Sequence, residues 1–451
     1  MSGSSEYAPG TAEFATDITA AGTPLVATDV GKVYPLVSIS FPVLNFVARR
    51  LAVLPKVVAL LGLSTSLLAA PGCKDHAPAP ETASPAAPEQ VLVSGQLLGE
   101  YSPAQLAQRV PEIPLVGALA RYSIKVYRLT YTTRNVDGTA ITASGALLLP
   151  VTAAALPVIS YQHGTISPAS ENTAPSYYNA GSELWSAVSV LASTGYAVSA
   201  PDYIGYGASK NLPHPYEHGA SLASASADML RAAREFCQQQ KVALNQKNFL
   251  LGYSEGGYAT MALHKLLEEK YATQLPVTAS APGAGAYHKT AFAGYILNST
   301  QPLNFLSTYV WVLDTYNKVY GLNRPYSYYF QEPYATRLAA NPRGPVPTLA
   351  SQLFAPGFKQ AVLTKSDAQL QAAFQANDLY DWKPRAPLAL FHGTADDYVP
   401  FFNSQDAYDA MRAHGATQVQ LKPIQGANHF TAIASYTLQA FAFISQYNTA
   451  Q

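Results

Sequence analysis

Short apolar runs alternate with longer stretches of helical spacing through most of the chain beyond residue 150. The apolar runs predict strands near 157–161, 196–200, 248–252, 276–280, 387–391 and 418–422. Apolar positions three and four residues apart predict helices near 182–193, 221–240, 256–270, 402–414 and 431–447. This alternation is typical of an α/β fold, a mostly parallel sheet with helices on both faces. Ligands of such sheets bind beyond the C-terminal ends of the strands.

Two segments depart from this alternation. Residues 124–151 predict a hairpin with a turn at 135–138 and a return strand, 145–149, that Pro150 ends. Residues 286–382 are rich in aromatic side chains and have little strand character, which predicts a mainly helical cap inserted over the site. The aromatic rings of this cap either line a cleft for the substrate or form the core of the cap itself.

The segment Gly252-Tyr253-Ser254-Glu255-Gly256 lies between a predicted strand and a predicted helix. Strand, Gly-x-Ser-x-Gly and helix is the layout of a nucleophile elbow, in which a sharp turn lifts the serine hydroxyl above the sheet. Side chains at the two glycine positions would collide with neighbouring backbone. Ser254 is therefore the candidate nucleophile.

A serine hydroxyl needs a base to take its proton and an acid to orient that base. Downstream of the serine, the predicted strand 387–391 opens into a polar loop that carries Asp396 and Asp397. We expect Asp396 to be the acid, with Asp397 as the rival. The other interpretation is that one or both carboxylates shape the turn or cap the next helix.

The candidate base, His429, stands in a loop after the last predicted strand. Its order along the chain, after the serine and the acid, is that of α/β-hydrolase triads. His414 and His392 are its competitors. His414 precedes Gly415 at a predicted helix C-terminus, and His392 belongs to the strand that leads to the acid.

Acyl transfer also needs two N–H donors directed at the developing oxyanion. The Glu255 amide, just after the nucleophile, is the first candidate. The second comes from the loop after the strand 157–161, where Thr165 is the better donor and Gly164 the next. An ordinary glycine turn is the alternative there. His163 is expected to be structural, and Asp202, upstream of the nucleophile, to hold its own loop by local hydrogen bonds.

The chain resembles the α/β-hydrolase superfamily over roughly residues 95–451. Four segments look most like the secretory lipase (lipase A-type) branch: Tyr161-Gln162-His163-Gly164-Thr165, Pro201-Asp202-Tyr203-Ile204-Gly205-Tyr206-Gly207, Gly252-Tyr253-Ser254-Glu255-Gly256-Gly257 and His392-Gly393-Thr394-Ala395-Asp396. In that branch a lid is inserted between the nucleophile strand and the acid strand. The resemblance implies carboxylic-ester hydrolysis by Ser254, Asp396 and His429, with no cofactor. The superfamily also contains peptidases and thioesterases, so the fold alone does not settle the substrate.

The composition argues against several other classes of protein function. The 451-residue chain carries 28 basic and 28 acidic residues. It therefore lacks the excess of positive charge that is typical of nucleic-acid-binding proteins. We find no Cys/His cluster with metal-ligand spacing and no Gly-rich phosphate loop. A charged fraction of only 12% suits an exported protein.

An export-like segment precedes the catalytic region. Arg49, Arg50 and Lys56 form a positive flank, and residues 57–70 are uncharged and mostly apolar, about the length of a signal h-region. Cys73 follows in a setting that resembles a bacterial lipoprotein processing site, which makes it the lipidation candidate and a possible membrane anchor. The alternatives are plain secretion and a membrane-anchoring helix. We therefore expect an exported protein that is periplasmic, secreted or an outer-membrane lipoprotein.

The predicted organisation has three parts. Residues 1–73 hold an N-terminal extension and the export segment, and an over-extended start of translation would explain residues 1–48. An Ala/Pro-rich tether follows at 74–94, and the catalytic domain spans 95–451. Cys237 ends an amphipathic run and is expected to be a buried free thiol.

Three functions compete on the sequence. The leading one is a serine carboxylesterase or lipase that acts on a small-molecule ester or lipid. The second is a peptidase for short peptides, which would need a charged pocket for a peptide terminus, and the sequence offers no clear candidate for one. The third is a catalytically inactive surface-anchored binding protein. Acyl-chain preference and oligomeric state are open.

Overall fold

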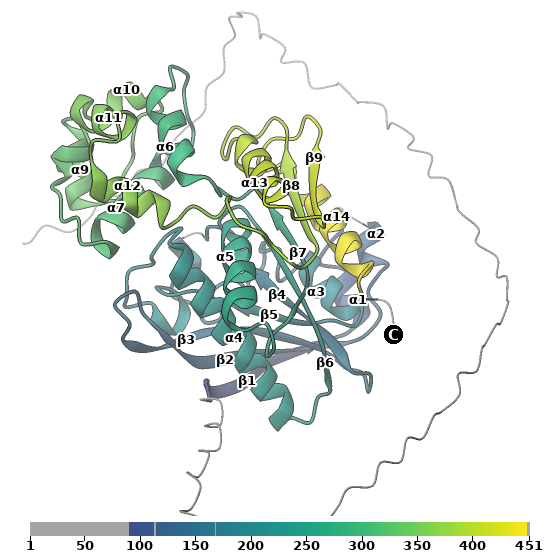
Figure 1. Cartoon of the computed structure of the whole chain (residues 1–451). Coiled ribbons are helices and arrows are strands. Elements are labelled where there is room, and N and C mark those ends of the chain that lie inside the picture. The colour runs from purple at the N-terminus through teal and green to yellow at the C-terminus, as the bar shows by residue number, and fades with distance from the viewer. Residues whose placement is uncertain (1–89, 112–113, 167, 449–451) are drawn as a thin grey trace, which may run out of the picture. The chain divides into compact units, whose positions relative to one another are not determined.

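The computed structural model describes residues 90–111, 114–166 and 168–448 (Figure 1). These residues all belong to one structural unit of the chain, Ala83–Gln451, and the other unit, Met1–Thr82, lies outside them. The export segment, Cys73 and the extension 1–48 lie outside the described residues as well, so the expectations for them stay predictions.

The described part of the chain is built on a nine-stranded sheet. Its strands are β1 (Leu92–Tyr101), β2 (Ile124–Arg134), β3 (Ala140–Pro150), β4 (Leu156–Gln162), β5 (Ala197–Pro201), β6 (Leu244–Tyr253), β7 (Val277–Gly283), β8 (Leu388–Gly393) and β9 (Val419–Ile424). Their order is β1-β2-β3-β5-β4-β6-β7-β8-β9. The pairs from β1 to β5 are antiparallel, and every pair from β5 to β9 is parallel. Parallel strands buried on both faces are nearly continuous apolar runs, as the fully buried β4 and β8 illustrate.

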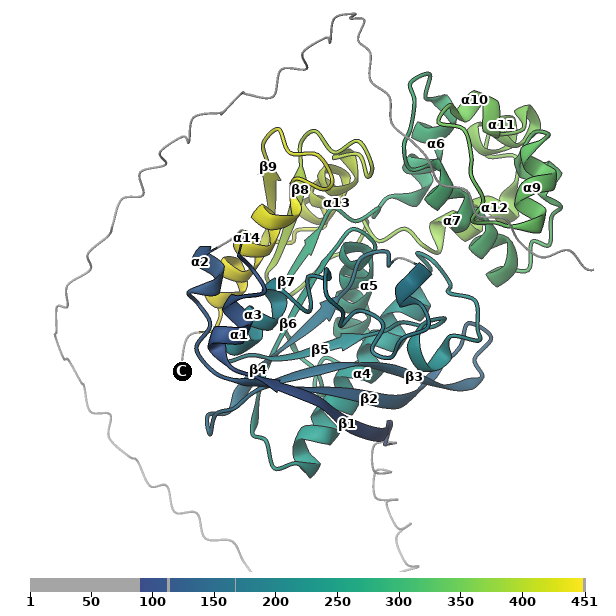
Figure 2. The same cartoon turned by 180° about the vertical axis from the view of Figure 1, so that it is seen from behind.

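Helices cover both faces of the sheet. On one face, α4 (Gly219–Gln239) and α5 (Glu255–Lys270) pack on the central strands, and α13 (Phe402–Ala413) packs on β8 and β9. On the other face lie α3 (Ala187–Ser193) and α14 (Ile433–Ser445), as Figure 2 shows from behind. The short helices α1 (Pro103–Ala107) and α2 (Pro114–Gly117) pack against α3, and two short 3₁₀ helices, η1 (Pro168–Ser170) and η2 (Gly207–Ser209), follow β4 and β5.

Seven helices between β7 and β8 form the cap, and Figure 1 shows them gathered in one body. They are α6 (Lys289–Asn298), α7 (Leu306–Val319), α8 (Tyr326–Tyr329), α9 (Tyr334–Ala340), α10 (Ala350–Leu353), α11 (Pro356–Leu363) and α12 (Ala368–Gln375). Most of the cap's aromatic rings are buried in one apolar cluster with α5, so they form its core more than they line a cleft.

The predicted fold class is confirmed, and the strands and helices that were predicted from the apolar pattern are present. The sequence pattern missed β1, which has mostly exposed side chains and therefore little apolar alternation. Residues 92–94, assigned to the tether, belong to this strand, and the Val91 and Leu92 amides donate to the Glu235 carboxylate. The sheet thus begins before the expected boundary at residue 95. Cys237 is a buried free thiol, as predicted.

Across the described residues, we find no helix that is both long enough and apolar enough to span a bilayer.

Candidate active site

Ser254 stands at the turn between β6 and α5, in a backbone conformation that side-chain-bearing residues rarely adopt, with φ 62° and ψ −124°. The flanking glycines make this turn possible. A Cβ on Gly256 would lie 2.1 Å from the carbonyl oxygen of Gln162, and one on Gly252 would lie 2.4 Å from that of Gly256. The local geometry is that of a nucleophile elbow, in which strain is stored at the nucleophile.

The structure brings the three predicted catalytic side chains into one hydrogen-bonded chain. His429 Nε2 is 2.9 Å from Ser254 Oγ, and His429 Nδ1 is 2.7 Å from Asp396 Oδ2. The three residues come from the ends of β6, β8 and β9, which meet at the same edge of the parallel sheet. Because the Asp396 carboxylate can only accept, His429 Nδ1 carries the proton and donates it in this hydrogen bond, which leaves the Nε2 lone pair facing the serine hydroxyl. This is the tautomer that a general base needs.

Asp396 is held ionised by its surroundings. The backbone amides of Tyr398 and Val399 donate to Oδ1 at 2.9 and 2.8 Å. Burial by itself raises the pKa of this carboxyl, but hydrogen bonds from His392 and His429 outweigh it and lower the pKa to about 2. A negative charge beside the imidazole is therefore present at all ordinary pH values.

The other candidates for the acid and the base, Asp397, His414 and His392, are not part of the hydrogen-bonded chain from Ser254 to Asp396. Asp397 is exposed, and the carboxylate that His429 contacts is that of Asp396. His414 caps the C-terminus of α13 ahead of Gly415 and pairs with the exposed Asp381. His392 is closer: its Nε2 lies 2.7 Å from the Val399 carbonyl and 3.3 Å from Asp396 Oδ2, so it supports the acid.

The predicted oxyanion donors lie beside the nucleophile. Among the described residues, the amides of Glu255 and Thr165 donate no hydrogen bond. A Cβ on Gly164 would be 3.8 Å from the Ser254 Cβ, which places this loop against the serine. The buried His163 donates from Nδ1 to the Gly164 carbonyl at 2.7 Å. In a trans peptide the N–H points opposite to the carbonyl, so this bond turns the Thr165 amide away from His163.

His163 is structural, as the sequence suggested. Its ring is stacked on that of Tyr177, with the centroids 4.6 Å apart, and also contacts the Tyr203 ring, which is tilted, at 4.2 Å. Burial lowers the pKa of His163, so the ring is neutral and donates one proton, to the Gly164 carbonyl. Asp202 is structural, but its hydrogen bonds are not the local ones that were expected. Its carboxylate accepts from the Ser144 hydroxyl and from the Ser176 amide and hydroxyl, which belong to other segments of the chain.

A second buried pair holds Glu255, the residue whose amide is the first candidate oxyanion donor. The Glu255 side chain points into the protein, where Oε1 lies 2.7 Å from His214 Nε2. His214 Nδ1 donates in turn to the Ile204 carbonyl at 2.7 Å. Both side chains are almost fully buried, so they fix the first residue of α5 and with it the direction of its amide. The sequence reasoning used only the backbone of Glu255 and missed this pair.

One small pocket reaches Ser254. It has a volume of about 20 Å³ and is lined by residues of the sheet edge, the cap and the acid loop: Tyr216, Glu217, Ser254, Phe292, Phe305, Thr308, Tyr309, Val312, Tyr398 and Val399. The Tyr216 hydroxyl lies 2.9 Å from the Thr165 hydroxyl, so this wall also supports the second oxyanion loop. Five of the ten lining residues are aromatic, and the cap contributes half of the lining.

Glu217 is the unexpected member of this lining. It forms a buried ion pair with Lys289, whose ammonium lies 4.3 Å from the centre of the Tyr258 ring. Burial raises the pKa of Glu217 and lowers that of Lys289, and their contact offsets part of both effects. No motif in the sequence marks Glu217, because its proximity to Ser254 arises only when the loop before α4 meets the cap.

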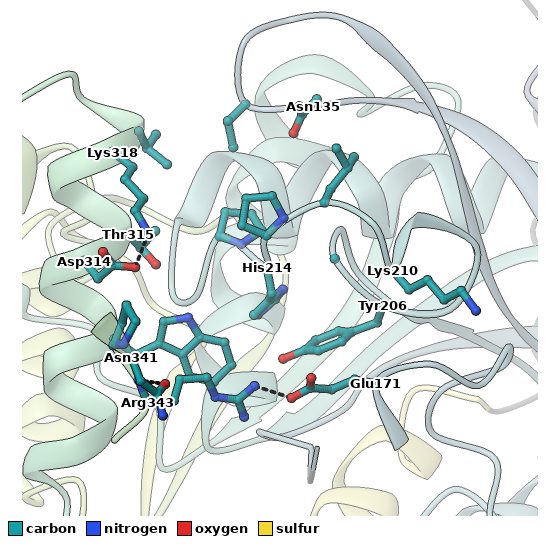
Figure 3. Close-up of a pocket in the computed structure, with 18 residues that line it drawn as sticks. Asn135, Glu171, Tyr206, Lys210, His214, Asp314, Thr315, Lys318, Asn341 and Arg343 are labelled. Carbon is teal, nitrogen blue, oxygen red and sulfur yellow. Dashed lines mark hydrogen bonds and ion pairs between the residues drawn. The ribbon is translucent and has the colours of Figure 1, made fainter. Parts of the chain in front are cut away.

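A larger pocket of about 390 Å³ lies between the cap and the loops after β4 and β5, and it does not include Ser254 (Figure 3). Figure 3 shows Arg343 of the cap paired with Glu171 across it. The Arg343 guanidinium also covers the Trp311 ring at 4.3 Å, and Trp311 stacks on Tyr216 at 4.3 Å. This stack separates the larger pocket from the pocket at the nucleophile.

The site holds no evident metal ligands. No group of three or more His, Cys, Asp or Glu side chains that could bind a metal ion occurs in the described ranges.

Comparisons with known proteins agree with this fold. The chain belongs to the alpha/beta hydrolase family, whose profile matches residues 163–442, and the predicted superfamily is therefore confirmed. A Legionella pneumophila structure is 28% identical, with a TM-score of 0.72, over 80% of this chain and 100% of that one. The rice cell wall degrading esterase LipA from Xanthomonas oryzae is 26% identical, with a TM-score of 0.69, over 79% of this chain and 97% of its own.

A protein of lower sequence identity shares this fold. Candida antarctica lipase A in its closed state is 17% identical, with a TM-score of 0.57, over 79% of this chain and 81% of its own. A search of curated proteins gives no match to this chain.

Proposed function

We propose that this protein hydrolyses carboxylic esters through a serine acyl-enzyme. The observation that carries the proposal is the hydrogen-bonded chain from Ser254 Oγ through His429 to Asp396, at 2.9 and 2.7 Å. The similarity to an esterase of the same family at 26% identity supports the choice of substrate.

The geometry supports a two-step reaction. Ser254 Oγ attacks the ester carbonyl while His429 Nε2 takes its proton, and Asp396 stabilises the imidazolium that forms. The amides of Glu255 and Thr165 hold the oxyanion of the tetrahedral intermediate. As this intermediate collapses, His429 returns the proton to the leaving alcohol and an acyl-serine remains. A water molecule, deprotonated by His429, then attacks the acyl group, and collapse of the second intermediate releases the acid and restores Ser254.

Initial rates on p-nitrophenyl esters from short to long acyl chains test this proposal. We expect Ser254→Ala to lower kcat by about 10⁴-fold or more with an unchanged fold, because the nucleophile is lost while the binding groups remain. Ser351→Ala, at an exposed position in the cap, is the matched control and should keep the wild-type rate. Substantial turnover by Ser254→Ala in a clean preparation would refute the mechanism.

A peptidase that acts on short peptides is the alternative within the family. Such an enzyme needs a charge that grips a peptide terminus, and Glu217 is the carboxylate in the pocket. Its charge is already offset by Lys289, which would repel a terminal ammonium. We therefore favour esters, and expect acyl esters to be cleaved much faster than the corresponding aminoacyl amides. Faster cleavage of the amides would favour the peptidase over the esterase.

A further inference from the structure

One loop contacts both of the residues whose amides are the candidate oxyanion donors. This loop, residues 214–217, lies between β5 and α4, and its His214 and Tyr216 side chains are buried. The Tyr216 hydroxyl is 2.9 Å from the Thr165 hydroxyl, and His214 Nε2 is 2.7 Å from Glu255 Oε1. The two halves of the predicted oxyanion hole therefore share one support.

Each of these contacts restrains the backbone of the residue that it reaches. Thr165 Oγ1 is three covalent bonds from the Thr165 amide nitrogen, and a β-branched side chain is stiff at χ1, so holding the hydroxyl also holds the amide. Glu255 is the first residue of α5, and its buried side chain is bonded to His214. His214 is fixed in turn, because its Nδ1 donates to the Ile204 carbonyl at 2.7 Å. The directions of both N–H groups thus depend on where the 214–217 loop lies.

The cap holds this loop through helix α7. The Trp311 ring stacks on the Tyr216 ring, with the centroids 4.3 Å apart and an angle of 7° between the planes. It also meets the His214 ring edge-on, with the centroids 5.6 Å apart. Tyr316, on the same helix, donates its hydroxyl to the Glu217 carbonyl at 3.0 Å. Three of the four loop residues are therefore in contact with one cap helix.

An ion pair ties Trp311 to the rest of the catalytic domain as well. The Arg343 guanidinium, on the cap segment between α9 and α10, lies 4.3 Å from the centre of the Trp311 ring. Arg343 pairs with Glu171, which belongs to the segment between β4 and β5 (Figure 3). Because this pair joins the cap to the sheet domain, it helps to keep Trp311 where it contacts the loop.

Packing of the cap core is the other explanation for these contacts. It accounts for most of the aromatic rings of the cap, which are buried in one apolar cluster. It gives no reason why the two loop rings that Trp311 touches each end at a candidate oxyanion donor residue. The contacts of Trp311 therefore point to the oxyanion hole.

We propose that the 214–217 loop positions both oxyanion donors, and that Trp311 makes this positioning depend on the cap. Tyr216 acts on the Thr165 amide, and His214 acts on the Glu255 amide. This inference rests on the proposed ester hydrolysis and adds three positioning residues to it: His214, Tyr216 and Trp311. The cap then contributes to the rate of the reaction as well as enclosing the substrate.

A double-mutant cycle tests the contact between Tyr216 and Thr165. Tyr216→Phe removes one hydroxyl and keeps the ring that stacks on Trp311, and Thr165→Val removes the other hydroxyl and keeps the amide. On p-nitrophenyl acetate, we expect each variant to lower kcat about tenfold with KM within about threefold of wild type. This loss is smaller than the roughly 10²–10³-fold effect of removing an oxyanion donor outright. Because both changes break the same contact, the double variant should lose no more than either single one.

Two variants of Trp311 test the role of the cap. Trp311→Leu removes the ring contacts to both loop residues, so we expect kcat to fall by about 10²-fold, the effect of misplacing a reacting geometry by about 1 Å. Trp311→Phe keeps a ring that can stack on Tyr216 and should retain more of the rate. Tyr196→Phe is the matched control. Its hydroxyl is bonded to Asn448 at 3.0 Å and its buried ring packs on Phe441 of α14, so kcat should stay at the wild-type value.

Thermal melts show which variants are folded, and the kinetics of the folded ones decide the inference. A wild-type kcat in Tyr216→Phe and in Trp311→Phe would overturn it, as would a change in KM alone. Losses in Tyr216→Phe and Thr165→Val that multiply in the double variant would also overturn it, because the two hydroxyls would then act independently. Each of these results leaves the proposed function standing if wild type shows Ser254-dependent hydrolysis. Absence of that hydrolysis would overturn both.

Discussion

Replacing Asp396 by Asn keeps the shape of the side chain and removes one hydrogen-bond acceptor. The amides of Tyr398 and Val399 both donate to Oδ1, so the Asn carbonyl oxygen must take that position. The Asn NH₂ then faces His429 Nδ1, where the carboxylate oxygen stood at 2.7 Å. His429 can relieve this clash of donors by changing its tautomer, whereas the peptide amides cannot change.

The tautomer change removes the general base. With the proton on Nε2, the imidazole has no lone pair to offer Ser254 Oγ at 2.9 Å. The same replacement in the Ser-His-Asp template lowers kcat by about 10⁴-fold, or about 5.5 kcal/mol of barrier, and we expect a loss of that order here. Initial rates on p-nitrophenyl acetate measure it, and a thermal melt checks that the fold is kept.

Asp397→Asn is the matched control, because Asp397 is the exposed neighbour on the same loop. Its rate should stay within about twofold of wild type, as surface substitutions away from a site have small effects. If Asp396→Asn kept a tenth of the wild-type rate, or if Asp397→Asn lost as much, the assignment of the acid would be wrong.

Two further predictions concern the elbow and its neighbouring loop. Gly256→Ala puts a methyl group 2.1 Å from the Gln162 carbonyl, so we expect the turn to shift and the ester-hydrolysis rate to fall by about 10²-fold, while Gly294→Ala, in open space, keeps it. An active, equally stable Gly256→Ala would contradict this. Burial raises the pKa of Asp202 from 3.8 to about 6, so its contribution to stability is present below pH 4 and is lost as the pH rises through 6. Relative to Asp202→Asn, the free energy of unfolding of wild type should therefore fall by about 3 kcal/mol from pH 4 to pH 7, at ~1.4 kcal/mol per pKa unit. Denaturant titrations at both pH values measure this difference, and parallel pH profiles for the two proteins would rule it out.

The sequence located the three side chains of the candidate triad because each follows a predicted strand. Ser254, Asp396 and His429 lie at strand ends that the apolar pattern marks, and parallel strands bring those ends to one edge. Local rules also predicted the glycine collisions at the elbow and the role of Asp202. The groups that these residues meet are distant in the sequence: the Gln162 carbonyl for Gly256, and Ser144 and Ser176 for Asp202. The motif thus predicted the roles of these residues but not their partners.

The parts that the sequence missed depend on contacts between distant segments. Glu217 and Tyr309 line one pocket only because the loop before α4 meets cap helix α7. His392 supports Asp396 through the shape of a loop that the sequence pattern does not describe. The sequence did not predict strand β1, because an edge strand with mostly exposed side chains shows no periodic pattern of apolar residues.

Labelling with a fluorophosphonate, followed by mass spectrometry of the digested protein, tests the central claim most directly. The reagent forms a covalent bond only with a serine that a neighbouring base activates. The account predicts one adduct per chain, on the peptide that contains Ser254, and none in Ser254→Ala. Ester hydrolysis by a protein that takes no label, or takes it on another serine, would contradict the account.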